Sequence, residues 1–336
     1  MNTKTNNQRL RFDPQKDKHV KYLFVSPFVN GGKFVASSIP LQAKIFPTKK
    51  HKTSDSLMYL FKNGLEVENM LIANACVVTN ELKKYIKDND IKVSFYEKGF
   101  FPHVGRWIFD NEGYFCESLL SKSRIEDIDI NEQEVQKSID EYKHKHIKQN
   151  RHLTIDGSFI TFVMQHPDDG TIQQGFDNFN GFQKIIDWIR SSVLEKNEYL
   201  IVKMHPSNHL TQEKINIPDK SIAIQSKDFN DSIIRNSELV IGINSSLLHD
   251  ASIIYHKPVL SLGKSWFTSH PEISPIISMA DKIIKRPVID DSIISYRRKM
   301  FYLLNKMQTP YQCDFKDFLY MHKKAQNIKA IEDWTK

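Results

Sequence analysis

The segment from residue 239 to 263 constrains the fold of this chain more than any other. An apolar run at 239–243 ends abruptly at the polar residues 244–246, a helical segment continues to about residue 255, and a second apolar run covers 259–262. A strand, a tight polar turn, a helix and another strand form the repeating unit of a parallel α/β sheet. We therefore expect this half of the chain to contain such a sheet.

The same alternation extends over the preceding residues. Apolar runs typical of strands lie at 158–165, 199–204 and 221–225, and helical patterns lie at 178–196 and 228–236. Strands that alternate with helices of this length indicate a doubly wound parallel sheet, a Rossmann-type domain.

The first half of the chain is less regular. It suggests strands at 21–29, 91–96 and 107–109, and helices at 54–61, 71–87 and 132–148. Residues 127–131 precede the last of these helices with a DxD sequence and Asn131, which we interpret as a helix cap. The basic end of that helix suggests a domain boundary. We expect an N-terminal Rossmann-like domain at 1–150, a C-terminal one at 151–310 and a helical tail at 311–336.

Composition narrows the class of protein. The 336 residues are 40% hydrophobic and 26% charged, a normal balance for a globular chain. No apolar run is long enough to cross a membrane, and the polar first residues lack the core of a signal peptide, so we expect a cytoplasmic protein. Three cysteines without CxxC spacing suggest neither a disulfide framework nor a zinc site.

The formal net charge of +7 favours anionic partners. Lys and Arg are spread along the chain and no nucleic-acid-binding signature occurs, so we do not expect a nucleic acid partner. A basic surface is compatible with peripheral association with the cytoplasmic face of the inner membrane, which we keep as an expectation.

Polar residues follow three of the expected strands of the second half. In chain order they are Gln165, Asp168 and Asp169, then Lys203, His205 and Pro206, then Asn244, Ser245 and Ser246. Parallel strands share one carboxyl edge, so we expect these residues to line one crevice. A carboxylate, an imidazole and the start of a helix that can hold a phosphate fit group transfer from a nucleotide-linked donor.

Simpler interpretations compete at each position. Ser245 and Asn244 could only cap a helix, and Glu97, at the end of the strand at 91–96, could be a surface residue or an acid–base group. A metal site is disfavoured, because Pro206 breaks the helix that would align the histidines of an HxxxH spacing and His166 lacks a suitable neighbour in sequence. We expect no metal and no cofactor.

Four segments resemble a known family. They are YEKGFFPHVGRWIFDNEGYFCESLL, QHPDDGTI, KMHPSNH and GINSSLLHDASIIYHKPVLSLG, which together span about residues 92–263. Their order and spacing are similar to those of bacterial capsule polysaccharide and lipopolysaccharide glycosyltransferases of the GT-B type. The nearest group is the retaining β-Kdo transferases, which use CMP-Kdo (Kdo is 3-deoxy-D-manno-oct-2-ulosonic acid).

The resemblance implies a role for each residue. Asp169 would attack the anomeric carbon of the donor, with Asp168 as the second choice, and Glu97 would assist the acceptor hydroxyl. His205 and Lys203 would stabilise the phosphate of the departing CMP. The other residues expected to bind the nucleotide sugar are Gln165, Pro206, Asn244, Ser245, Ser246 and Asp250.

Several positions depart from the family pattern. Met204 and Thr171 replace a proline and a serine, Asp250 stands where a ribose-contacting Glu is usual, and the helix before Lys257 is one residue longer. The donor base and sugar therefore stay open. The implied function is transfer of an acidic sugar, Kdo in the first place, to a surface polysaccharide or its lipid-linked precursor. The alternatives are a GT-B transferase or epimerase with another nucleotide sugar, and a non-catalytic glycan- or nucleotide-binding module of capsule assembly.

Overall fold

The structure is a computed structural model. It describes residues 12–26, 43–47, 52–73, 78–101, 106–113, 115–146, 155–167, 170–177, 179–205, 216, 221–224, 230–281, 284–310 and 315–335. The chain divides into two compact units, one formed by residues 1–120 with 304–336 and the other by residues 121–303. The expected α/β class with two Rossmann-type sheets and C-terminal helices is confirmed.

The first unit is built on a six-stranded sheet with the order β11-β5-β4-β3-β1-β2. Its strands are β1 (His19–Ser26), β2 (Ala43–Pro47), β3 (Glu66–Ala73), β4 (Lys92–Lys98), β5 (Arg106–Asp110) and β11 (Gln308–Pro310). Strands β2, β1, β3 and β4 run parallel, whereas β5 and β11 add two antiparallel pairings at one edge. The strand order reverses between β1 and β3, as in doubly wound folds.

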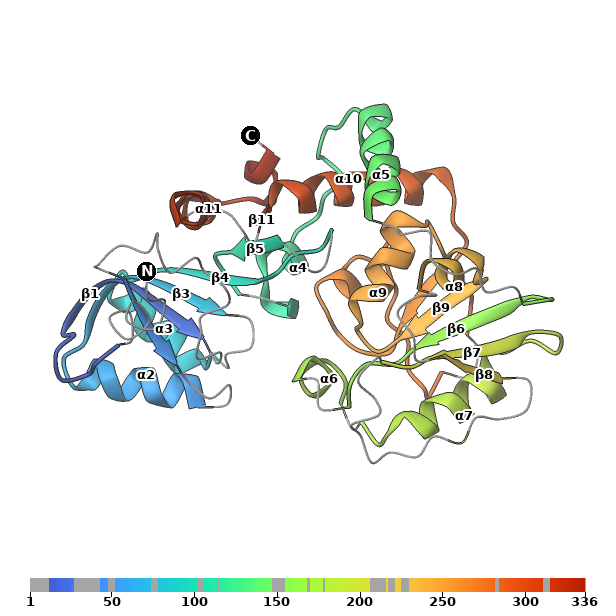
Figure 1. The fold of residues 1–336 in the computed structure, drawn as a ribbon, viewed down its shortest axis with the longest axis horizontal. Coiled ribbons are helices and arrows are strands. Elements are labelled where there is room, and N and C mark those ends of the chain that lie inside the picture. The colour runs from blue at the N-terminus through green and yellow to red at the C-terminus, as the bar shows by residue number, and fades with distance from the viewer. Residues whose placement is uncertain are drawn as a thin grey trace, which may run out of the picture. The chain divides into compact units, whose positions relative to one another are not determined.

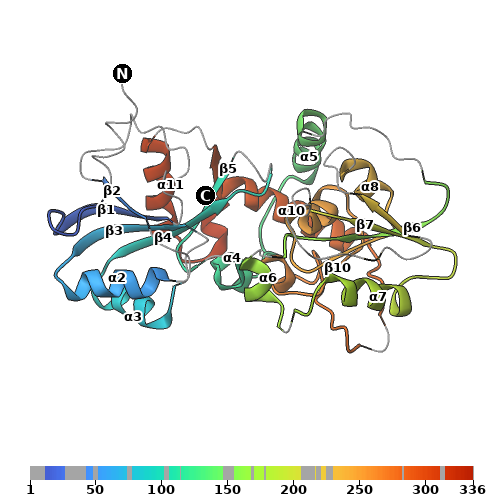
Figure 2. The same cartoon turned by 60° about the horizontal axis from the view of Figure 1, so that its bottom comes forward.

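Helices cover both faces of this sheet. Figure 2 shows α2 (Thr53–Lys62) and α3 (Asn80–Asp88) on one face and α11 (Phe315–Asn327) on the other. Helix α3 begins at a Thr79 cap, whose side chain accepts the N–H of Leu82. Helix α11 turns Phe318, fully buried, towards the sheet. The last helix of the chain therefore belongs to the first unit.

The expected helix at 71–87 is wrong over its first residues. Residues Met70, Leu71 and Ile72 belong to β3, and the helix begins only at Asn80. The cause is the place of β3 between β1 and β4, where both faces of the strand are covered and all three side chains are fully buried. A strand buried on both faces has no polar alternation, so its apolar run resembles a buried helix.

The second unit contains an all-parallel sheet with the order β10-β9-β6-β7-β8. Its strands are β6 (Phe159–Val163), β7 (Tyr199–Lys203), β8 (Ser221–Ile224), β9 (Leu239–Gly242) and β10 (Val259–Ser261), and each falls within a run that the sequence predicts. Strand order reverses between β6 and β9. This topological switch point is where ligands bind in open α/β sheets.

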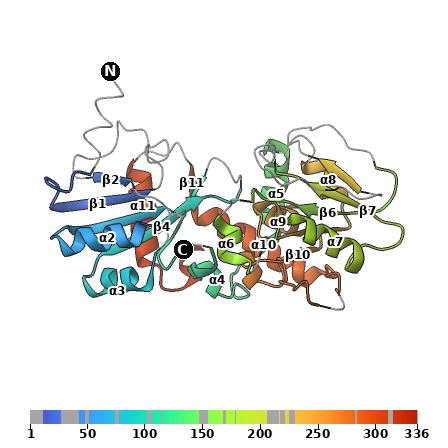
Figure 3. The same ribbon diagram turned by 90° about the horizontal axis from the view of Figure 1, so that it is seen from below.

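Two helices lie on opposite faces of the second sheet (Figure 1): α7 (Phe182–Ser192) and α8 (Asn230–Asn236). The larger apolar cluster joins Phe162 to Phe182 and Ile186 on the α7 side, and a smaller one joins Phe159 and Ile201 to Ile233 on the α8 side. Figure 3 looks at this sheet from the α7 side. Burial on both faces fixes the strands and thereby the position of their carboxyl edge.

The units differ from the expected domain boundaries at two places. Helix α5 (Glu132–His146) belongs to the second unit, because Glu132 forms an ion pair with Arg298 of α10 (Asp291–Lys306) at 2.9 Å. Residues 304–336 belong to the first unit, because β11 pairs with β5. The expected cap of α5 is confirmed: the Asn131 side chain accepts the N–H groups of residues 133 and 134.

Candidate functional site at the carboxyl edge of the second sheet

Gln165 and Asn244 join the two strands that flank the switch point. Gln165 follows β6 and Asn244 follows β9, and both side chains are buried. The backbone N–H of Asn244 donates to Gln165 Oε1 at 3.0 Å, and Gln165 Nε2 donates to Asn244 Oδ1 at 2.8 Å. The two residues expected at one crevice therefore lie in contact there.

Asn244 also holds the short helix α6 (Gly170–Gly175) and the segment after β10. Its Nδ2 donates to the carbonyl oxygens of Thr171 at 2.8 Å and Lys264 at 3.2 Å, and its Oδ1 accepts from Thr171 Oγ1 at 3.2 Å. The backbone N–H of Lys264 in turn donates to Gly175 O at 2.6 Å. The side-chain groups of Asn244 are thus engaged within the protein, and its evident role is to position the loop after β6.

Two imidazoles meet beside this network. The rings of His166, after β6, and His205, after β7, lie edge to face with centroids 5.8 Å apart and an interplanar angle of 87°. Both side chains are partly exposed, whereas Lys203 beside them is buried. This pair could not be predicted from the sequence, because residues that follow two different strands become neighbours only through the register of the sheet.

The start of the helix after β9 has the expected cap. Ser245 Oγ accepts the N–H of Leu247 at 3.4 Å, and α9 (Ser246–His249) begins at the next residue. Ser245 and Ser246 are both partly exposed and follow β9, at the edge that also carries Gln165. Capping and phosphate binding are compatible, because a helix start presents further backbone N–H groups.

Asp250 begins a π-helical turn that continues α9 over Asp250–Ile254. Such a turn accommodates one additional residue, which matches the extra residue before Lys257. Asp250 Oδ1 lies 3.0 Å from Nδ1 of buried His249. The Asp250 charge also adds to the effect of burial in raising the pKa values of Tyr142 and Tyr255. The structure therefore places Asp250 among the residues around α5 and the π-turn.

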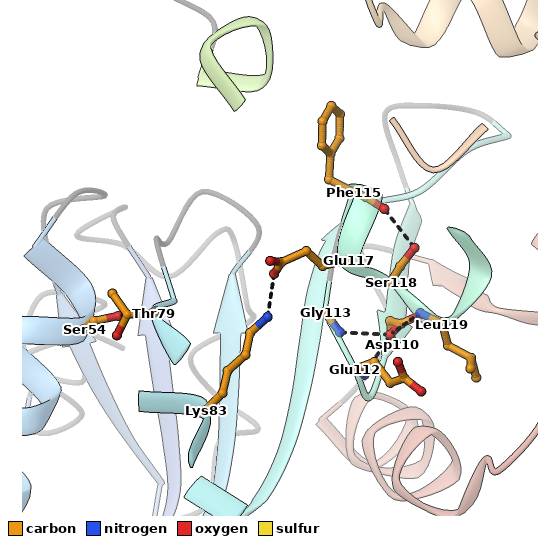
Figure 4. A network of polar contacts seen from close by, with 10 residues as sticks. All are labelled: Ser54, Thr79, Lys83, Asp110, Glu112, Gly113, Phe115, Glu117, Ser118 and Leu119. Carbon is orange, nitrogen blue, oxygen red and sulfur yellow. Dashed lines mark hydrogen bonds and ion pairs between the residues drawn. The ribbon is translucent and has the colours of Figure 1, made fainter. Parts of the chain in front are cut away.

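Glu97 belongs to β4 in the first unit and pairs in register with Ile108 of β5. The turn after β5 is fixed by Asp110, whose carboxylate accepts the backbone N–H groups of Glu112, Gly113 and Leu119 at 2.8–3.1 Å (Figure 4). Burial raises the pKa of Asp110, and these bonds act in the opposite direction. The sequence Asp110 to Gly113 thus forms a hydrogen-bonded turn that follows β5, the strand paired with the one that carries Glu97.

Three residues of the expected site, Asp168, Asp169 and Pro206, lie outside the described residues. Thr171 and His205, which lie close to them in the sequence, are described and lie at the switch-point edge. Within the described ranges, no group of three or more His, Cys, Asp or Glu side chains has an arrangement that could hold a metal ion. The expected roles of the site residues stay predictions.

Solved structures with the same fold include two transferases. The KpsC β-Kdo 2,4-transferase of Thermosulfurimonas dismutans is 10% identical with a TM-score of 0.55, and the alignment covers 84% of this chain and 90% of that chain. The KpsC β-Kdo 2,7-transferase of the same organism is 17% identical with a TM-score of 0.50, covering 84% and 89%.

No curated protein matches the sequence significantly. Among the described helices, none combines the length and apolar character needed to cross a bilayer. Residues 114–271 match the family of capsule polysaccharide biosynthesis proteins. The chain therefore resembles these capsule biosynthesis proteins over residues 114–271 and has the GT-B fold of the KpsC β-Kdo transferases.

Proposed function

We propose that this protein is a glycosyltransferase that moves Kdo from CMP-Kdo to a bacterial surface polysaccharide or its lipid-linked precursor, with retention of configuration. The observation that carries the proposal is the grouping of polar residues at the switch point of the second sheet. Gln165, Asn244 and the imidazole of His205 lie at the carboxyl edge, where open α/β sheets bind ligands. The family match over residues 114–271 supports capsule biosynthesis as the setting.

In the proposed reaction the Asp169 carboxylate attacks the anomeric carbon of Kdo. The bond from that carbon to the phosphate oxygen breaks, and CMP leaves with the electron pair. The acceptor hydroxyl then attacks the same carbon, its oxygen replaces the Asp169 oxygen, and Glu97 takes the hydroxyl proton. A carboxylate nucleophile divides a difficult substitution into two easier steps, and two inversions give net retention.

The charge that develops on the departing phosphate requires fixed donors. Lys203 is buried at the end of β7 and supplies an ammonium group, His205 supplies a ring N–H, and the start of α9 supplies backbone N–H groups. The bonds between Asn244, Thr171 and Gln165 hold α6 in place directly after Asp169. Preorganised donors of this kind reduce the reorganisation needed in the transition state.

The test is Asp169→Asn with Asp177→Asn as the matched control, because Asp177 is exposed just beyond α6. Transfer of Kdo from CMP-Kdo to an isolated capsule glycan should fall at least about 1,000-fold in the first variant and remain unchanged in the control. CMP affinity, measured by calorimetry, should persist in both. Full activity of Asp169→Asn would refute the role of Asp169 as the nucleophile.

The donor is tested separately with a panel of CMP-, UDP- and GDP-sugars. We expect hydrolysis or transfer only with the CMP-sugars, and CMP to bind more tightly than UMP or GMP. If the protein binds none of the three nucleotides, the proposed transferase function is excluded. Preference for UMP or GMP would redirect the proposal to another donor.

A further inference from the structure

His166 lies beside His205 at the carboxyl edge of the second sheet, and the proposed reaction gives it no role. The β6–β7 ladder pairs Val163 with Lys203 and continues with the Met164 N–H donating to Lys203 O at 2.9 Å. The pairing therefore extends to within two residues of each histidine. Gln165, immediately before His166, is fixed by Asn244. The backbone thus presents both imidazoles at the same edge of the sheet.

The ring geometry bears on how these imidazoles can act. In an edge-to-face pair, one ring directs its rim at the π face of the other. The ring that presents its face keeps both nitrogen atoms, which lie in its own plane, out of that contact. Because both side chains are partly exposed, a ligand at this edge of the sheet can reach the two rings.

The surroundings favour an anion at this position. Lys203 contributes an ammonium group at the end of β7, where its Nζ donates to Met204 O at 3.3 Å. Ser245 and Ser246 follow β9 at the same edge, and both are partly exposed. Imidazole, ammonium and hydroxyl groups all donate hydrogen bonds to phosphate oxygens.

We propose that His166 is a second imidazole that contacts the phosphate of the nucleotide donor, so that His166 and His205 bind it as a pair. The proposal rests on the proposed function for the identity of the ligand. It assigns to His166 a direct hydrogen bond to the phosphate, beyond support for the ring of His205.

Two substitutions separate a direct contact from a structural one. His166→Phe keeps an aromatic ring that can maintain the edge-to-face contact but cannot hydrogen-bond. His166→Gln loses the ring, yet its amide can reach close to the position of the imidazole Nε2. The matched control is His144→Phe, since His144 is exposed on α5.

The probes are CMP and cytidine, which differ only by the phosphate, and their dissociation constants are measured by calorimetry on the full chain. We expect His166→Phe to weaken CMP binding by about 10-fold or more and leave cytidine binding unchanged, because a hydrogen bond to a charged group is lost. His166→Gln should retain more CMP affinity than His166→Phe, and the control should bind as the wild type does.

Two results would overturn the proposal while leaving the proposed function intact. One is CMP binding by His166→Phe at wild-type strength, which would make His166 a packing residue. The other is an equal loss of CMP and cytidine affinity, which would indicate a general distortion. If the wild-type protein binds neither probe, the proposed CMP-linked donor fails, and the phosphate contact fails with it.

Discussion

Gln165 and Asn244 exchange two hydrogen bonds across the switch point, although they lie 79 positions apart in the sequence. Each residue ends a different strand, and the pair closes the gap at which the strand order reverses. The Asn244 side chain then ties α6 and the segment after β10 to this point. One buried amide therefore joins the loops after β6, β9 and β10, and the first two of these carry residues of the proposed donor site.

Asn244→Ala should destabilise the second unit by about 2–4 kcal/mol, because Gln165 Nε2 and the carbonyl oxygen of Thr171 would be left without these partners in a buried place. Urea unfolding followed by Trp fluorescence measures the change. The control is Asn327→Ala at the exposed end of α11, where a bond to Lys323 O is lost, and it should cost less than about 1 kcal/mol. Equal losses would show that the Asn244 network adds no stability of its own.

The second sheet could be predicted from the sequence because its physical cause is local. Strands such as β6 and β9 are covered on both faces, so they appear as short apolar runs between helical segments. Sharing a carboxyl edge follows from parallel pairing, which is why the strand-end residues could be expected to meet. The same signal gave a wrong result at β3, since an apolar run buried on both faces does not distinguish a strand from a helix.

The candidate site was less predictable than the sheet. The contact between His166 and His205 depends on strand register. The hydrogen bonds of the Asn244 side chain depend on the position of α6, a six-residue helix that the hydrophobic periodicity does not indicate. The π-helical turn at Asp250 has a signal in the sequence, the one additional residue before Lys257. A comparison of lengths could reveal the insertion, but only coordinates show that it is absorbed within the helix.

The buried histidine of the first unit predicts a pH dependence of stability. His322 on α11 is fully buried against Ser94 of β4 and also contacts Gln326 at 2.8 Å. Burial lowers the pKa of His322 to about 4, from about 6.5 for the ordinary side chain. Between about pH 4 and pH 6.5, His322 is therefore protonated in the unfolded chain but neutral in the folded unit. The first unit should therefore be most stable above about pH 6.5 and lose up to about 3 kcal/mol as the pH falls to about 4.

Amide hydrogen exchange measured on peptides from α11 between pH 4 and 7, corrected for the intrinsic exchange rate, reports this change. His322→Gln should flatten the dependence in α11. His256→Gln is the matched control, because burial and the nearby charge of Arg297 lower the pKa of His256 to about 4 in the second unit. An unchanged slope in α11 of His322→Gln would assign the effect to other groups.

The turn after β5 should depend on both oxygens of Asp110. The Leu119 N–H donates to both of them, and Gly113 donates to Oδ1 (Figure 4). In Asp110→Asn an NH₂ group replaces one acceptor and faces a donor, so we expect a loss of about 1–3 kcal/mol in thermal or urea unfolding of the first unit. Asp90→Asn, an exposed change in the same unit, should be nearly neutral. No difference between the two variants would contradict this account of the turn.

Gly113, in the same turn as Asp110, should also be intolerant of substitution. A Cβ atom at this position would lie 2.8 Å from the carbonyl oxygen of Glu117, which is backbone and cannot easily move. Gly113→Ala should therefore destabilise the first unit, whereas Gly64→Ala tests backbone conformation alone, because Gly64 has a φ of 84° and open space around it. The strain of that φ should cost Gly64→Ala about 1 kcal/mol. Gly113→Ala should exceed this in urea unfolding, and a smaller loss would show that the turn can relax.

Arg297 should act as a buried structural cation of the second unit. Its guanidinium is 1% exposed and donates to the carbonyl oxygens of Glu272 at 2.8 Å and Lys257 at 3.1 Å, which ties α10 to the residues on both sides of β10. Burial lowers the pKa of Arg297 to about 9, which is still high enough to keep the group charged at neutral pH.

Arg297→Met removes the charge but leaves the two carbonyl oxygens without these donors, so we expect a loss of about 2–4 kcal/mol. Arg235→Met removes an exposed pair with Asp231 on α8 and should cost less than about 1 kcal/mol. Unfolding in urea compares the two variants directly. If Arg297→Met is as stable as the wild type, the hydrophobic side chain compensates for the lost bonds. Arg297 would then not be needed to hold the segment that follows the π-helical turn.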